Sequence, residues 1–76
     1  MRTIQDDNLE LWEVYASAGD FGFPEHSRIV FHSLTDRTRR ARALTRDLDR
    51  AAVERELSVL SDRELTGLLE TAGELS

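Results

Sequence analysis

The sequence contains no cysteine and no lysine, and it has only one proline and one tryptophan among its 76 residues. Without cysteine there is no disulfide and no thiolate metal site. Its apolar runs, such as Ile29-Val30-Phe31, fall far short of the roughly 20 residues that cross a bilayer. Residues 1–7 lack the apolar stretch of a secretory signal. We therefore expect a cytoplasmic protein that has no membrane partner.

A chain of this length fits one domain, which we place at residues 1–76. Hydrophobic residues make up 39% and charged residues 33% of the sequence, a balance typical of globular rather than disordered chains. A domain of this size buries only roughly 60% of the surface of its unfolded chain. We therefore expect a homo-oligomer or a bound partner to add stability.

Local signals predict a mainly α fold of four to five short helices. For a helix over 7–18, Asp7 is the predicted cap, and Leu11, Val14 and Tyr15 follow helical spacing. Residues 19–24 are predicted to be a loop. Asp36 is the predicted cap of a helix that reaches residue 44 or 48, after which a bend is expected.

The last part of the chain predicts a helical hairpin over residues 50–72. Thr45 or Asp49 is available to cap its first helix, which ends near Leu60. Ser61 and Glu64 have the spacing of a reciprocal capping box at the start of the second helix.

Residues 28–34 are ambiguous between a helix and a strand. Ile29, Val30 and Phe31 favour a strand, whereas Pro24 suits the first turn of a helix. The alternative fold is therefore α+β with one short strand at about 28–34, whose partner strand would come from a second copy. The predicted core holds the large apolar side chains of all segments: Leu11, Trp12, Tyr15, Phe21, Phe23, Val30, Phe31, Leu44, Leu48, Val53, Leu57, Leu60, Leu65, Leu68 and Leu69.

The charges are ordered along the chain. Residues 1–27 carry six acids and one arginine, residues 28–46 six arginines and one acid, and residues 47–76 eight acids and three arginines. The three balances are −5, +5 and −5. The central basic segment is therefore the first place to look for a binding surface, and the candidate partner-binding residues are Arg37, Arg39, Arg40, Arg42 and Arg46.

Two interpretations of these arginines remain open. In the first, they face protein, and Arg39 and Arg46 pair with acids of this chain or of a partner copy. In the second, an arginine-rich helix over 37–46 follows the phosphates of a nucleic acid. The acidic flanks and the absence of interleaved aromatic residues favour the first interpretation.

Catalytic and metal sites are not indicated. His26 and His32 are six residues apart, which matches no common zinc spacing, and Ser27 and Ser33 lie in no nucleophile motif. No phosphate-binding loop follows Gly19. We therefore predict no catalytic residues, no cofactor and no metal, and a protein that is not an enzyme.

One order of residues is similar to that of a known family. Leu11-Trp12, Ala18-Gly19-Asp20, a proline, Ile29-Val30-Phe31, Asp36-Arg37 and Ala41-Arg42-Ala43-Leu44 follow one another between residues 6 and 48. This order resembles the first half of the ribonuclease E inhibitor family of the regulator B type, with its helix–loop–strand–helix order. The family continues with strands where we expect two helices, and no site residue carries over. The resemblance implies a regulator of a ribonuclease.

These observations predict a non-catalytic adaptor, inhibitor or regulatory protein that binds another protein through a charged helical surface. A nucleic-acid-binding protein that uses helix 37–46 is the alternative. A small accessory subunit of a larger enzyme, or a ribonuclease-regulator-like protein, is the second alternative.

Overall fold

The structure, a computed structural model, describes residues 2–17, 27–36 and 38–74. In chain order its elements are β1 (Arg2–Gln5), β2 (Leu11–Ser17), β3 (Ser27–Ser33), β4 (Arg42–Arg46), α1 (Arg50–Val59), α2 (Asp62–Thr71) and β5 (Gly73–Glu74). The fold is therefore α+β, and our prediction of a mainly α fold with four to five helices is wrong.

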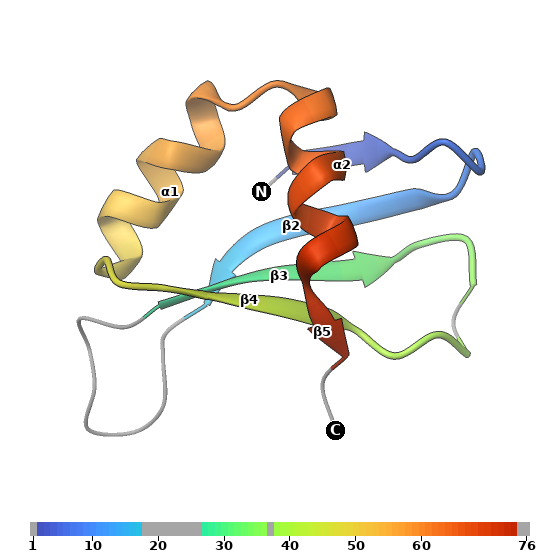
Figure 1. The fold of residues 1–76 in the computed structure, drawn as a ribbon, viewed down its shortest axis with the longest axis horizontal. Coiled ribbons are helices and arrows are strands. Elements are labelled where there is room, and N and C mark those ends of the chain that lie inside the picture. Colours follow the sequence, from blue (N-terminus) through green and yellow to red (C-terminus); the bar gives the residue numbers. More distant parts are fainter. Residues whose placement is uncertain (1, 18–26, 37, 75–76) are drawn as a thin grey trace.

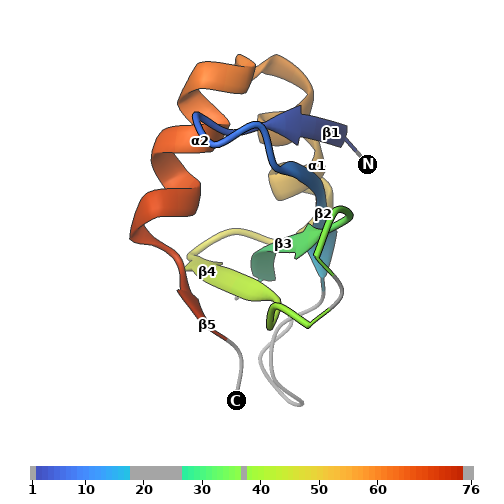
Figure 2. The same cartoon turned by 90° about the vertical axis from the view of Figure 1, so that its right-hand side faces the viewer.

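The strands form one antiparallel sheet in the order β1-β2-β3-β4-β5, so neighbours in the chain are neighbours in the sheet (Figure 1). The two-residue β5 only extends the edge beside β4. Figures 1 and 2 show both helices on the same side of the sheet. α1 packs mainly against β2 and β3, and α2 against β1 and β4.

The core lies between the sheet and the helices, and its strand residues follow a period of two. Trp12 and Val14 are buried on β2, and they pair with Ser33 and Phe31 on β3. Successive strand side chains point to opposite faces, so alternate residues reach the helices. The buried cluster is Ile4, Trp12, Val14, Ala16, Ile29, Phe31, Val53, Leu57, Leu65, Leu69 and Ala72.

The predicted helix over 7–18 is wrong, because this segment forms a turn and then β2. The apolar pattern satisfies both periods: Leu11, Val14 and Tyr15 fit a helix, and Trp12, Val14 and Ala16 fit a strand. Pairing with β1 and β3 decides in favour of the strand. The predicted Asp7 cap is wrong as well, because no helix starts there; the carboxylate of the neighbouring Asp6 instead accepts from amides of the β1–β2 turn.

The predicted helix from Asp36 is also wrong, since a loop and β4 replace it. For residues 28–34 the strand alternative is correct, because β3 covers Ser27–Ser33. However, β3 finds both neighbours, β2 and β4, within the chain and needs no second copy. The arginines of residues 39–46 therefore lie on a loop and a strand, not on the helical surface that we predicted.

The two C-terminal helices and their caps are confirmed. Asp49 Oδ1 accepts from the Ala52 amide at 2.8 Å at the start of α1. Ser61 and Glu64 form the predicted capping box, with bonds of 3.1 and 3.2 Å. The helices diverge from their connection, and each packs mainly on strands (Figure 1).

The predicted core is right for the residues of the helices and for the centre of the sheet. Trp12, Val30, Phe31, Val53, Leu57, Leu65 and Leu69 are buried, and Leu44, Leu60 and Leu68 pack against the core while partly exposed. Tyr15 is half-buried, whereas Leu11 and Leu48 are exposed, contrary to prediction. Phe21, Phe23 and the predicted loop over 19–24 lie outside the described residues.

Candidate functional site

Three of the five arginines that we predicted to bind a partner meet at one end of the sheet. Arg39 and Arg40 lie on the β3–β4 loop and Arg42 begins β4, and with Trp12 they line a cleft of 370 Å³. We call these four residues the arginine cleft. The fourth described arginine, Arg46, lies outside it, and Arg37 lies outside the described residues.

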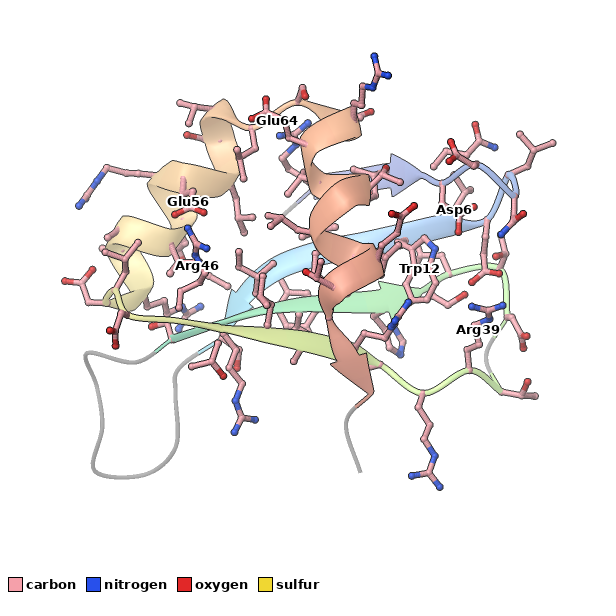
Figure 3. All side chains as sticks on the ribbon, in the orientation of Figure 1. Asp6, Trp12, Arg39, Arg46, Glu56 and Glu64 are labelled. Carbon is pink, nitrogen blue, oxygen red and sulfur yellow. The ribbon has the colours of Figure 1, made fainter. Side chains whose placement is uncertain are left out.

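Arg46 is held at the opposite end of β4 by an ion pair. Its Nη2 lies 2.7 Å from Glu56 Oε1 on α1, and both side chains are partly buried. Figure 3 shows Arg46 and Glu56 together, at the far end of the sheet from Arg39. This pair fastens α1 to the sheet, so Arg46 has a structural partner rather than a place in the cleft.

Arg39 is fixed by a closed ring of polar contacts. Its Nε lies 3.3 Å from Glu10 Oε2, and the same oxygen accepts from Ser33 Oγ at 3.2 Å. Ser33 Oγ accepts from the Asp36 amide at 3.1 Å, and the Asp36 carbonyl accepts from the Arg39 amide at 3.2 Å. The ring joins the β3–β4 loop to the end of the β1–β2 turn, where Glu10 lies, and orients the Arg39 side chain. Arg39 and Arg46 thus both form the ion pairs expected of protein-facing arginines.

Asp36 shapes the same loop. Its Oδ1 accepts from the Thr38 hydroxyl at 2.6 Å and from the Thr38 amide at 3.0 Å. These two hydrogen bonds, with Arg39 nearby, hold the pKa of the Asp36 carboxyl below its usual value of 3.8. The negative charge of Asp36 therefore persists at neutral pH beside the arginines.

Trp12 forms the floor of the arginine cleft and is only 1% exposed. The Arg39 guanidinium carbon lies 5.8 Å from the centre of its ring, within the range of a cation–π contact. At the edge of the ring, the Trp12 Nε1–H donates to Asp6 Oδ2 at 3.0 Å (Figure 3). The ring is therefore contacted by a cation over its face and by a carboxylate at its edge.

Asp6 also holds the turn between β1 and β2. Its Oδ1 accepts from the amides of Asn8 and Glu10, each at 2.9 Å. Burial raises the pKa of Asp6, but the hydrogen bonds from Trp12, Glu10 and Asn8, together with Arg39, outweigh it and bring the pKa below 3.8. Asp6 is therefore ionised at neutral pH and supports the floor of the cleft.

Arg42 and Arg40 differ in their freedom. The Nε of Arg42 donates to the carbonyl of Ala72, the C-cap of α2, at 3.0 Å, so this side chain is anchored. Arg40 is exposed and forms no hydrogen bond or ion pair with the residues that the structure describes. The cleft thus offers two arginines in fixed positions and one that is available to a ligand.

Exposed leucines surround this end of the sheet. Leu9, Leu11 and Leu34 are exposed by 73%, 38% and 44%, and the Leu34 amide donates to the Leu11 carbonyl at 2.8 Å. Leu9 has a φ of 63°, a left-handed conformation that costs a non-glycine residue about 1–2 kcal/mol. Sequence reasoning missed Leu11 as a surface residue because its spacing indicated a buried helical stripe.

Among residues 2–17, 27–36 and 38–74, no three His, Asp or Glu side chains lie close enough together to hold a metal ion. His32 is exposed on β3, and His26 falls outside these ranges. None of the helices in this part of the chain is both long and apolar enough to span a membrane.

Comparisons with protein-family models, curated proteins and solved structures find no match to this chain.

Proposed function

We propose that this chain is a non-catalytic adaptor, inhibitor or regulatory protein of the cytoplasm that binds another protein. Its binding surface is the arginine cleft together with the exposed Leu9, Leu11 and Leu34. The supporting observation is the placement of three arginines on a well-fixed loop and strand, at the end of the sheet where these leucines are also exposed. Arginine is enriched in protein interfaces, and apolar anchors beside it supply affinity.

The charge of the cleft specifies the kind of partner. Arg40 forms no hydrogen bond or ion pair with the described part of the chain, so its charge is available to an acidic group. Arg39 is already paired with Glu10. Its fixed guanidinium therefore orients the partner more than it neutralises an acidic group of the partner. We therefore propose an acidic protein surface with apolar side chains, since charges at the rim of an interface govern association rate and specificity.

Affinity purification from the native host tests this proposal, with Arg40→Glu as the decisive variant. Arg55→Glu is the matched control, because Arg55 is also exposed, lies on α1 and lines no part of the cleft. We expect the partner to co-purify with the wild type and with Arg55→Glu. Its recovery should fall about tenfold or more with Arg40→Glu. Equal recovery with both variants would contradict the proposal.

The same eluates test the nucleic-acid alternative. If nucleic acid rather than protein co-purifies, and its binding falls steeply as salt rises, the arginines contact phosphates and the proposal is wrong. Light scattering on the purified complex then determines whether the partner is another protein or a second copy of this chain.

A further inference from the structure

The arginine cleft continues into a groove that follows α2. A hollow of 360 Å³ shares Trp12, Arg39 and Arg42 with the cleft and adds Asp7, Thr66 and Glu70. A third hollow, of 580 Å³, shares those last three residues and extends along α2. Because each hollow shares lining residues with the next, the three adjoin one another, and the second and third lie beside α2. We treat them together as one groove.

The charge of this groove changes along its length. Its first part carries Arg40 and Arg42, and its middle carries the exposed carboxylates of Asp7 and Glu70 beside the paired Arg39. The far part adds Asp62, which is paired with Arg2, and the exposed Arg63. Neither Asp7 nor Glu70 forms an ion pair within the ranges that the structure covers. An occupant that matches the first and middle parts must therefore carry an acidic group followed by a basic group.

Gly67, in the middle of α2, lies in the wall of the same groove. Outside its own helical turns, no atom of the described residues lies within 4 Å of the point where a Cβ would stand. Glycine in a helix interior is less stable than alanine, so a packing or functional reason for it is expected. The described residues offer no packing reason for Gly67, whereas the close approach of another backbone does.

We infer that this groove binds an extended peptide segment of the partner, with an acidic residue facing Arg40 and Arg42 and a basic residue facing Asp7 and Glu70. The backbone of the segment passes over Gly67. The 10 residues of α2 rise about 15 Å, which an extended peptide covers with about five residues. The inference rests on the proposed function, because it names the part of the partner that is recognised.

Fluorescence anisotropy with labelled, capped hexapeptides tests the inference. The probes are Glu-Glu-Ser-Ser-Lys-Lys and its reverse, because a groove can accept either chain direction. The control peptide has the same composition with glutamate and lysine alternating. We expect one segregated peptide to bind about tenfold more tightly than the control, as several exposed ion pairs together allow. Equal affinity for all three peptides would overturn the inference.

Gly67→Ala separates binding from folding. The space at Gly67 is open, so we expect the melting temperature to rise by about 4–8 °C. The added methyl group should nevertheless lower the affinity for the segregated peptide about fivefold or more, because it displaces the peptide backbone that lies against the helix. Arg55→Ala, on α1 and outside the groove, should leave peptide affinity unchanged.

The two proposals fail in different ways. If Gly67→Ala leaves peptide affinity unchanged, the groove inference is overturned, while a loss of partner co-purification with Arg40→Glu still supports the proposed function. If the partner still co-purifies with Arg40→Glu, both proposals are wrong.

Discussion

Replacing Asp6 with asparagine separates the hydrogen bond to Trp12 from the two bonds that hold the β1–β2 turn. Asparagine keeps one carbonyl oxygen, which can still accept from the amides of Asn8 and Glu10. In place of Oδ2 it presents an amide group, a donor facing the Trp12 Nε1–H donor. The variant therefore leaves a buried indole N–H without an acceptor and keeps the turn.

The expected cost of Asp6→Asn is about 2 kcal/mol. A hydrogen bond to a charged acceptor contributes about 1.5–3 kcal/mol, and Trp12 is only 1% exposed, so water cannot replace the lost acceptor fully. A chain of 76 residues is stable by roughly 4–11 kcal/mol, so the loss is a large share of the total. The melting temperature should fall by roughly 10 °C.

The Asp6→Asn variant should also remove part of the loss of folding stability at acidic pH. The folded pKa of Asp6 lies below the unfolded value near 3.8, so its contribution is present above about pH 4 and is lost as pH falls through the folded pKa. The stability difference between wild type and Asp6→Asn should therefore be largest at pH 7 and smaller at pH 3.

Urea unfolding measures this difference. Trp12, the single tryptophan, reports by fluorescence, and circular dichroism provides a second signal. Asp7→Asn is the matched control, because Asp7 is exposed and forms no hydrogen bond or ion pair within the described residues. The reasoning is refuted if Asp6→Asn lies within about 0.5 kcal/mol of the wild type at pH 7, or if the difference stays the same at pH 3.

Two further substitutions test the local structure. Leu9→Asn should stabilise the chain by about 0.5–1 kcal/mol, because asparagine tolerates the left-handed conformation at φ 63° better than leucine; a lower melting temperature would contradict the assigned backbone. Ser61→Ala should destabilise α2 by about 1 kcal/mol through loss of the cap on the Glu64 amide. An unchanged urea midpoint for Ser61→Ala would show that the cap adds nothing to stability.

The sequence predicted the helices correctly where their signals are local. Asp49, Ser61 and Glu64 lie within a few residues of their hydrogen-bond partners. Spacing therefore identifies the capping box of Ser61 and Glu64, whereas the structure decides for Asp49 over Thr45 at the first helix. The strand β2 was missed because Leu11, Val14 and Tyr15 fit a helix, and the competing alternation becomes decisive only once β1 and β3 pair with β2. Pairing between distant segments is not visible in a short window of residues.

The arginine cluster shows the same limit. The sequence identified Arg39, Arg40 and Arg42, but it placed them with Arg46 on one helix. On a helix, residues four apart lie about 6 Å from each other, whereas four residues along a strand span about 13 Å. Because residues 42–46 form β4, Arg46 reaches α1 instead of the cleft. Arg39 is oriented by Glu10, a contact that only the folded sheet creates.

Two local features near the groove act against the stability of the free chain. Leu9 adopts a left-handed backbone and exposes its side chain, and Gly67 puts a residue of low helix propensity inside α2. Sequences that specify one fold usually follow local rules, and departures concentrate where binding requires them. Leu9 directly follows Asn8, which lines the same groove as Glu70. If Leu9 and Gly67 served the fold alone, Leu9→Asn and Gly67→Ala would destabilise the chain. The binding explanation requires both substitutions to stabilise the chain and to weaken its binding to the partner.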